Sequence, residues 1–527
     1  MSMAEETETR RGSGLRVVHV SSSDRAGGAA LAMWGLHDGL CRLGVDSRVV
    51  VRHCEVPDAR VSVVRSDLLE MADRFHTQRL NGNLPEGATC VSLVSVVVDL
   101  LEHPWVAEAD VVHLHWVATF LRPEVVRLLE AAGKTVFMTL HDQRHFTGFC
   151  HFTAGCRGFE TDCANCPQAD EGLHAMVREE RLRLNEAYGS RRVQVIASSK
   201  WVAREALASG LFDAEQLHVL RYAVADVFRV KTRRISPQRG TRRKQRWLFG
   251  CQVLGERRKG LAELQRALNR AMESEAFAAA VASGAVELRA FGEAASPFLE
   301  GLPVPVQMLG TLRAVELATE YREADVFWCP TLEDTGPLVA MEALACGCPV
   351  AGFATGILPD LVTEGVNGSL VPPGDVEGLA ELMKTLVLEA GVLSRLGEGA
   401  ELRRGEVDSV EVAAGRMLDL YEERLARWEP VAPVTGLRAA AVTLSSRWDE
   451  GHLPEVEKFF REFPVVSKHE AQLQHLRRRL EVEIGKKEAL KRKVEVLRLE
   501  VNERDERRRG GWRRFWSSVQ RRLRFRK

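Results

Sequence analysis

The feature that most constrains the fold is an alternation of short apolar, β-rich runs with longer segments of helical periodicity. Strand-like runs occur at 15–20, 46–51, 109–114, 134–140 and 193–197, and a second series occurs at 247–249, 286–291, 306–310, 326–329 and 349–353. Helical patterns separate them, as between Ala29 and Leu43. This alternation is typical of parallel sheets. The sequence therefore predicts an α/β chain with two Rossmann-like domains that face a common cleft.

Changes of composition suggest where these parts begin and end. We expect a polar lead over 1–14, a first domain over 15–232, a basic linker over 233–246, a second domain over 247–402, a crossover helix over 403–428, a linker with short helices over 429–468, a charged helix over 469–506 and a basic tail over 507–527. No signal peptide is recognisable, and the apolar run 91–101 is too short to span a bilayer. Scattered cysteines do not indicate a disulfide scaffold. These features predict a cytoplasmic protein.

The segment 331–350 carries the clearest chemical pattern. Asp334 and Glu342 lie on either side of the start of a helix predicted over 337–346, with Thr335 as N-cap and Pro337 in the first turn. Such a helix start directs unpaired N–H groups at an anion, most naturally a phosphate. Glu342 stands among apolar residues and needs hydrogen-bond partners. Those partners are either backbone amides or the hydroxyls of a ribose.

Two loops repeat the strand–glycine–helix order expected of a diphosphate site. Gly27 and Gly28 follow the first strand of the first series, and Lys259 with Gly260 follows the first strand of the second. Glycine pairs are common in ordinary turns, but between a strand and a helix they let backbone N–H groups approach a diphosphate. The neighbouring Arg257 and Arg258 are either solvated charges or further contacts to that diphosphate.

Histidines and cysteines gather in the first domain. Histidines occur in Val111–Trp116 and again at His141, which is followed by Asp142, where two predicted strands end. Four cysteines follow with the spacing C-x5-C-x6-C-x2-C: Cys150, Cys156, Cys163 and Cys166. The last pair has the spacing of a zinc half-site, although the first is more widely spaced than in common zinc ribbons. A structural zinc and four free thiols remain alternatives.

These motifs resemble those of a known family. Asp334-x7-Glu342 resembles the acid-x7-acid signature of family 4 retaining glycosyltransferases, which have the two-domain GT-B architecture. The order His-Asp-x-x-x-Phe-Thr-Gly from His141, followed by the four cysteines, resembles a bacterial polysaccharide-type subgroup. The resemblance covers about residues 15–390. In the family the first acid contacts the donor sugar and the second holds the ribose. Here the first acid is Asp334 with Glu333 beside it, so either carboxylate could reach the sugar.

The resemblance implies transfer of a sugar from a nucleotide-diphosphate sugar to a glycan or lipid-linked acceptor, in cell-surface polysaccharide synthesis and without a catalytic metal. It assigns the donor to Gly27, Gly28, Gln252, Arg258, Lys259, Gly336, Pro337, Leu338 and Glu342, and the chemistry to His141, Asp142, Asp334 and Lys259. Gln252 stands near the position of an arginine in the family. A nucleotide-sugar epimerase and a catalytically weakened scaffold protein are the alternatives.

The C-terminal part differs in character. Apolar residues at steps of three and four within 469–506 indicate either a self-associating coiled coil or a single solvated helix. The tail 507–527 carries ten Arg and Lys residues, no acid, and both Trp512 and Trp516. An amphipathic basic helix of this kind suits an anionic membrane surface. Nucleic-acid binding and a disordered tail without a partner are the alternatives, and the tryptophans favour the membrane.

We expect the whole chain to bind anionic vesicles and a chain lacking 507–527 not to, because each cation near such a surface contributes up to about 1 kcal/mol. Co-sedimentation with phosphatidylserine and phosphatidylcholine vesicles measures this. Binding should weaken as salt is added. A chain that ignores both vesicle types but binds DNA through the tail would show that the membrane assignment is wrong.

Overall fold

The computed structural model describes residues 14–65, 67–80, 83–93, 98–230, 244–293 and 301–427. All of them belong to one compact unit, Met1–Trp448. The predicted lead except for Gly14, most of the basic linker, the linker with short helices 429–468, the charged helix 469–506 and the basic tail 507–527 lie outside the described residues. Within the described part, no helix is both long enough and apolar enough to cross a bilayer.

The first sheet has seven parallel strands in the order β3-β2-β1-β4-β5-β6-β7. The strands are β1 (Arg16–Ser23), β2 (Asp46–His53), β3 (Val61–Val63), β4 (Val111–Leu114), β5 (Thr135–Leu140), β6 (Gln194–Ala197) and β7 (Leu217–Val219). The accompanying helices are α2 (Gly27–Arg42), α3 (Asp67–Leu80), α4 (Pro104–Glu108), α5 (Val125–Ala131), α6 (Glu171–Ala187) and α7 (Lys200–Ala208), with 3-10 turns η1 (Leu100–Glu102), η2 (Gly158–Glu160) and η3 (Ala214–Gln216). The short helix α8 (Asp226–Arg229) packs instead on helices of the second domain, where Phe228 enters a hydrophobic cluster.

The second sheet has six parallel strands in the order β10-β9-β8-β11-β12-β13. They are β8 (Gln245–Val253), β9 (Val286–Glu293), β10 (Val306–Gly310), β11 (Val326–Cys329), β12 (Val350–Phe353) and β13 (Gly368–Val371). The helices are α9 (Leu261–Met272), α10 (Glu275–Ala282), α12 (Ala314–Glu323), α13 (Leu338–Ala345), α14 (Leu358–Leu361), α15 (Val376–Leu388) and α16 (Val392–Arg403), with turns η4 (Arg257–Lys259) and η5 (Arg404–Glu406).

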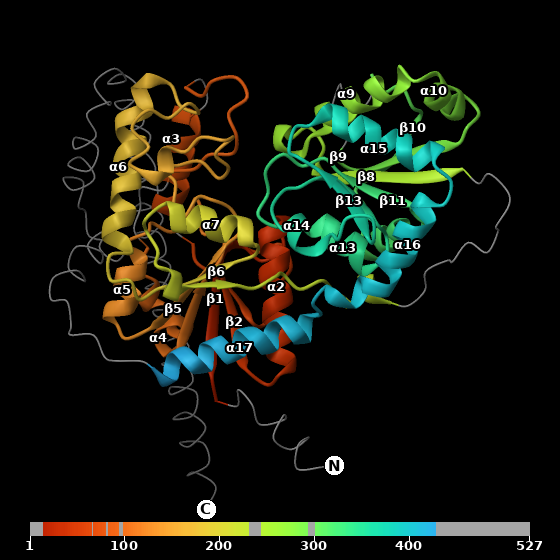
Figure 1. Cartoon of the computed structure of the whole chain (residues 1–527). Coiled ribbons are helices and arrows are strands. Elements are labelled where there is room, and N and C mark those ends of the chain that lie inside the picture. The colour runs from red at the N-terminus through yellow and green to blue at the C-terminus, as the bar shows by residue number, and fades with distance from the viewer. Residues whose placement is uncertain are drawn as a thin grey trace, which may run out of the picture. The chain divides into compact units, whose positions relative to one another are not determined.

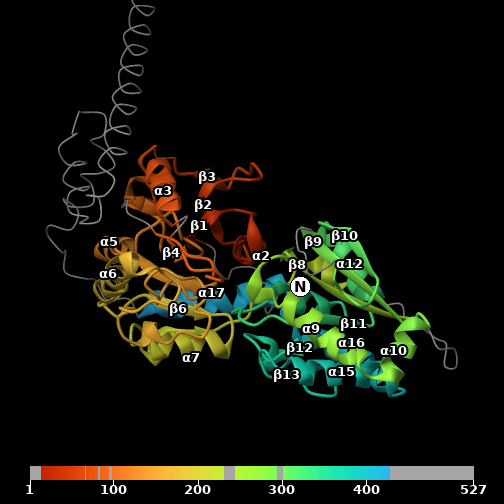
Figure 2. The same ribbon diagram turned by 90° about the horizontal axis from the view of Figure 1, so that it is seen from above.

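Both faces of each sheet are buried. In β8, Trp247 and Phe249 pack into one hydrophobic cluster and Leu248 between them packs into another. In β1, the neighbours Val17 and Val18 likewise pack into two different hydrophobic clusters. Successive side chains of a strand point to opposite faces, so helices must cover each sheet on two sides, and Figures 1 and 2 show that they do. The predicted pair of Rossmann-like domains is confirmed.

Helix α17 (Val410–Ala426) returns to the first sheet after the second is complete. Figure 1 shows it in blue beside α2, below the strands of the first sheet. Its Tyr421 is fully buried, and the hydroxyl lies 2.6 Å from Nδ1 of His113 on β4. The crossover expected over 403–428 is thus a helix that begins later, at Val410, after the turn η5.

Three strands are missing from the prediction: β3, β7 and β13. Each is three or four residues long and stands at a sheet edge. An edge strand has one neighbour only, and these have partly exposed side chains, so no apolar run marks them. The interior strands were predicted because burial on two faces requires continuous apolar runs.

Candidate functional site

A buried ion cluster lies where strands β8 and β11 end. Asp334, in the loop after β11, accepts hydrogen bonds from Nη1 of Arg258 and Nζ of Lys259, each at 2.7 Å. Burial alone would raise the pKa of Asp334, but the two cations outweigh it and hold the pKa well below its usual range. The acid is therefore ionised, and two cations are fixed at the carboxyl edge of the second sheet.

Two glycines allow the loops around this cluster to approach each other closely. Gly260 has a φ of 74°, and a Cβ on it would stand 1.7 Å from the carbonyl oxygen of Pro330. Gly356 has a φ of 56°, and its Cβ would stand 2.2 Å from the carbonyl oxygen of Asp334. A side chain fits at neither position. Turn η4 therefore lies directly against the loop that carries Asp334.

The helix predicted after Asp334 is present but begins later than expected. Helix α13 runs from Leu338 to Ala345 with Pro337 at the N-cap, and no side chain caps it. The prediction that Thr335 is the N-cap is wrong, because its hydroxyl donates instead to the carbonyl oxygen of His141, in the first domain, at 2.8 Å. An uncapped helix start beside two cations is a suitable place for a phosphate.

Glu342, the second acid of the signature, lies half-buried on α13. The hydroxyl of Tyr321, on α12, donates to its Oε2 at 3.3 Å. Burial raises the pKa of Glu342 to about 7, and the hydrogen bond from Tyr321 only partly opposes this. The hydrogen-bond partner expected for the Glu342 carboxylate is thus present, and it is the hydroxyl of Tyr321.

Glu333 faces the first domain, whereas Asp334 faces the cations of the second. The Glu333 carboxylate accepts hydrogen bonds from the backbone N–H and hydroxyl of Thr153, each at 3.0 Å, and from the N–H of Ala154 at 2.9 Å. Beside it, the Arg258 guanidinium lies 3.9 Å from the centre of the Phe152 ring. Both contacts come from the cysteine-bearing segment 150–166. Of the two adjacent acids, Asp334 is thus the one that belongs to the cation cluster.

The glycine turn of the first domain also faces this site. A Cβ on Gly27 would stand 3.8 Å from Oε1 of Gln252, and one on Gly28 would stand 3.7 Å from Cδ1 of Leu338. The structure therefore brings together the predicted donor residues of both domains: Gly27, Gly28, Gln252, Arg258, Lys259, Gly336, Pro337 and Leu338. Arg257 is not among them, because it pairs with Glu263 on α9.

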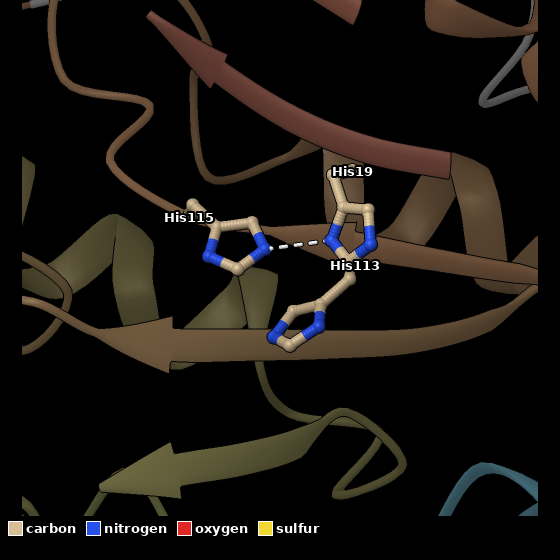
Figure 3. A group of neighbouring side chains, drawn as sticks. All are labelled: His19, His113 and His115. Carbon is tan, nitrogen blue, oxygen red and sulfur yellow. Dashed lines mark hydrogen bonds between the residues drawn. The ribbon is translucent and has the colours of Figure 1, made fainter. Parts of the chain in front are cut away.

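The histidines at the strand ends form a hydrogen-bonded chain. Nδ1 of His19 lies 2.9 Å from Nε2 of His115, and Nδ1 of His115 lies 3.0 Å from Nε2 of His141. Figure 3 shows the first of these bonds. Burial lowers the pKa of all three rings, and neighbouring histidines lower those of His19 and His115 further. The chain therefore consists of neutral imidazoles, and it ends at His141 next to the second domain.

His19, His113 and His115 each offer a nitrogen within 4.8 Å of the others, close enough for one metal ion. Both nitrogens of His113 are already hydrogen-bonded, however, to Tyr421 and to the hydroxyl of Thr139, at 2.6 and 2.8 Å. Both nitrogens of His115 are engaged in the chain as well. A metal would have to displace these bonds, so the geometry favours a hydrogen-bond network.

Asp142 is buried inside the first domain. Its Oδ2 accepts from Nε1 of Trp116 at 2.7 Å and lies 2.5 Å from Nδ1 of His151, and its Oδ1 accepts from the N–H of Arg144 at 2.9 Å. Burial opposes ionisation of Asp142, yet its neighbour His151 holds the pKa below its usual range. The carboxylate is satisfied by the domain interior, which does not favour its predicted catalytic role.

The four cysteines of the first domain are free thiols in one segment. Cys150, Cys163 and Cys166 are buried, and Cys156 is half-buried. Among the described residues, no group of three ligand atoms within 4.8 Å includes a cysteine sulfur. The geometry thus gives the predicted zinc no preformed set of thiolate ligands, and the zinc stays a prediction.

Comparison with known proteins gives a partial match. Residues 245–389 match the family model described as "Glycosyl transferases group 1". A D-inositol 3-phosphate glycosyltransferase of Streptomyces bingchenggensis is 36% identical over 121 residues, which are 23% of this chain and 26% of that protein. The sulfoquinovosyl transferase SQD2 of Arabidopsis thaliana is 35% identical over 100 residues, 18% of this chain and 20% of that one. The chain thus matches about a quarter of the length of such relatives.

Solved structures extend the likeness over both sheets. Sucrose-phosphate synthase from Thermosynechococcus elongatus has a TM-score of 0.54 at 18% identity, covering 79% of this chain and all of that one. HepE of Anabaena, solved in complex with UDP, has a TM-score of 0.51 at 16% identity, covering 78% of this chain and all of that one. At these identities the likeness shows the GT-B fold alone.

The raised pKa of Glu342 generates a prediction about stability. Between pH 4.5, the ordinary carboxyl pKa, and pH 7, the folded chain keeps a proton that the unfolded chain releases. The free energy of unfolding of the nucleotide-free wild type should therefore fall as pH rises through this range, by at most about 1.4 kcal/mol per pH unit from this group. In Glu342→Gln this contribution disappears. Urea denaturation at pH 5, 6, 7 and 8 measures the difference.

The matched control is Glu275→Gln, an exposed acid in the first turn of α10, which should keep the wild-type pH dependence. Parallel curves for the wild type and Glu342→Gln would contradict the raised pKa.

Proposed function

We propose that this chain is a retaining glycosyltransferase that moves a sugar from a nucleotide-diphosphate sugar to a hydroxyl of a glycan or lipid-linked acceptor. The observation that carries the proposal is the buried cluster of Asp334 with Arg258 and Lys259, beside the uncapped start of α13. This cluster lies within the segment that matches the glycosyltransferase family model. The whole chain's activity, donor and acceptor are parts of the proposal.

The roles of the residues follow from their charges. Lys259, Arg258 and the first N–H groups of α13 would hold the diphosphate and stabilise the negative charge that develops as it leaves. The acceptor oxygen bonds to the anomeric carbon while the bond from that carbon to the diphosphate breaks. The acceptor's proton passes to the departing phosphate, so no side-chain base and no catalytic metal are required. Asp334 fixes the two cations and lies where the donor sugar would be.

Glu342 would hold the nucleotide ribose. It lies on the helix whose start would face the diphosphate, and within the described part of the chain its carboxylate accepts one side-chain hydrogen bond, from Tyr321. Ribose hydroxyls would supply further partners to a carboxyl group that burial otherwise disfavours as an anion. The structural relative HepE is a complex with UDP, which is consistent with a uridine nucleotide as donor.

The match to the family model covers residues 245–389, and to this half we assign donor binding. Relatives that match over similar lengths are named for different reactions: one is a D-inositol 3-phosphate glycosyltransferase and another a sulfoquinovosyl transferase. The first domain, outside the matched segment, would therefore set the acceptor. We place the reaction in cell-surface polysaccharide synthesis at the inner face of a membrane, with the tail 507–527 as the contact and 469–506 as a segment for self-association.

The two alternatives make different predictions. An epimerase would convert one nucleotide sugar into another and release no free sugar. A scaffold protein would bind a nucleotide sugar weakly and turn over none. The fixed cation cluster favours transfer, because cations stabilise a diphosphate that leaves. An epimerase that keeps its nucleotide does not need to release that group.

The first test is turnover of UDP-glucose, UDP-galactose, UDP-N-acetylglucosamine and GDP-mannose, followed as release of free nucleotide. We expect Lys259→Ala to lower kcat about a hundredfold or more, because it removes charge from the leaving group, while Arg258 still neutralises Asp334 and keeps the protein folded. The matched control is Lys384→Ala, whose lysine pairs with Glu381 on α15. Equal losses of melting temperature and activity in Lys259→Ala would indicate a structural role.

In the same assay Glu342→Gln should abolish transfer in a folded protein and weaken nucleotide binding by roughly 1.5–3 kcal/mol. Near-normal nucleotide affinity in this variant would show that the ribose assignment is wrong.

The predicted zinc has its own test. Protein purified without added metal should contain about one zinc per chain if the four cysteines ligate one ion, and Cys163→Ser together with Cys166→Ser should lose it. The double variant Cys346→Ser with Cys348→Ser, on the second domain, is the control. Metal-free wild-type protein with four titratable thiols in this segment would contradict the prediction.

A further inference from the structure

Arg258 is held by groups from both domains. Its Nε and Nη2 donate to the two carboxylate oxygens of Glu256 at 2.6 and 3.3 Å. Its Nη1 donates to Asp334 at 2.7 Å and to the backbone carbonyl oxygen of Glu333 at 3.2 Å. These partners lie around the edge of the guanidinium and belong to the second domain. The face of the guanidinium has a neighbour from the first domain, Phe152, whose ring centre lies 3.9 Å from Cζ.

Phe152 is buried, with 6% of its surface exposed, but it does not contribute to the core of its own domain. Phe149 and Phe159, in the same segment, belong to the hydrophobic cluster of the first domain, whereas Phe152 is in none of the clusters that the described residues form. An aromatic face attracts a cation, and more strongly where water is excluded. Phe149 and Phe159 therefore stabilise the first domain, whereas the ring of Phe152 contacts a cation of the other domain.

The backbone around Phe152 is fixed to the first sheet. The carbonyl oxygen of His151 accepts from the N–H of Gln143, after β5, at 2.9 Å, and the N–H of Thr153 donates to Oε1 of Gln143 at 3.0 Å. Nδ1 of His151 lies 2.5 Å from Oδ2 of Asp142. Phe152 stands between these two bound residues, so the position of its ring is set by the first domain.

Glu333 joins the same stretch to the second domain. Its carboxylate accepts from the N–H and the hydroxyl of Thr153 and from the N–H of Ala154. Ala154 has a φ of 50°, a left-handed conformation that is unfavourable for alanine. Such a conformation persists where surrounding contacts hold it. We call these hydrogen bonds, together with the ring of Phe152 on Arg258, the 152–154 contact.

We propose that Phe152 and Glu333 are positioning residues for the donor diphosphate, because they hold Arg258 in place only while the two domains are in contact. The proposal rests on the proposed glycosyltransferase function, which assigns Arg258 to the diphosphate, and extends it to two residues outside that assignment. When the domains separate, Arg258 keeps its partners in the second domain but loses the ring on its face. Nucleotide affinity therefore depends on the fraction of molecules in which the domains are in contact.

Two variants break the 152–154 contact from opposite sides. Phe152→Leu keeps an apolar side chain but removes the aromatic face. Glu333→Gln replaces one acceptor oxygen by an NH2 group, which cannot accept from the N–H groups that it would meet. The matched control is Phe159→Leu, which removes another buried ring of the same segment. The face of that ring lies 5.0 Å from Cζ of Arg157, an arginine that pairs within the first domain.

The first arm of the test measures the affinity of UDP and GDP by isothermal titration calorimetry. For the nucleotide that the wild type binds, we expect both variants to bind about five- to tenfold more weakly, since a desolvated cation on an aromatic ring contributes a factor of this size. Phe159→Leu should keep the wild-type affinity even where its melting temperature falls. A role confined to stability would lower the melting temperature and leave the affinity of the folded protein unchanged.

The second arm follows amide hydrogen exchange of the ligand-free protein by mass spectrometry. We expect faster exchange in both variants within residues 150–158 and at the N–H of Lys200, which donates to Asp360 of the second domain at 2.9 Å. Lys200 begins another element, α7, so faster exchange there reports separation of the domains. A peptide that covers β5 should keep its wild-type exchange, which excludes global unfolding.

Wild-type nucleotide affinity in both variants, or wild-type exchange at Lys200, would overturn the proposal and leave the proposed function intact. An equal loss of affinity in Phe159→Leu would overturn it as well. A wild type that binds neither nucleotide would instead overturn the proposed function, and the role in diphosphate binding with it. The two failures are distinguishable, because exchange at Lys200 is measured without a ligand.

Discussion

The site depends on one buried carboxylate. An ionised acid in a protein interior is unfavourable unless cations compensate it, and Asp334 has two, Arg258 and Lys259. To bring them within 2.7 Å, the turn after β8 must lie on the loop after β11, which in turn requires a glycine at position 260 against Pro330. The neighbouring strands β8 and β11 are paired in register, so their carboxyl ends deliver both loops to the same place. The ion cluster therefore depends on the pairing of β8 with β11 in the second sheet.

The same region joins the two domains. Glu333 receives three hydrogen bonds from Thr153 and Ala154, and Thr335 donates to the backbone of His141. A third contact runs from the N–H of Lys200 to Asp360 at 2.9 Å. The first two join loops at the carboxyl ends of strands, and the third joins the first residue of α7 to α14, two helices that follow such strand ends. Ligands of doubly wound sheets bind at these ends. Separation of the domains would thus break contacts of the residues adjacent to Asp334.

Much of this arrangement could be predicted from the sequence because it depends on local patterns. Buried strands require apolar runs, and Lys259 and Asp334 lie in the loops that follow two such runs, β8 and β11. What could not be predicted depends on contacts between distant segments. Nothing local to Thr335 distinguishes an N-cap from a donor to His141, and nothing local to Glu333 reveals its partners 180 residues earlier.

The imidazole chain from His19 through His115 to His141 has a consequence for how protons are distributed. A neutral imidazole carries one proton on its two nitrogens, so each ring donates on one side and accepts on the other. The three rings must therefore share one direction, and only two arrangements exist. If Nδ1 of His141 donates, Nε2 of His19 must accept, and the reverse also holds. A ligand group that hydrogen-bonds to Nδ1 of His141 would thereby select the tautomer of all three rings. Whether that group donates or accepts would decide whether Nε2 of His19, in the interior of the first domain, carries a proton, although the net charge of the chain of rings stays the same.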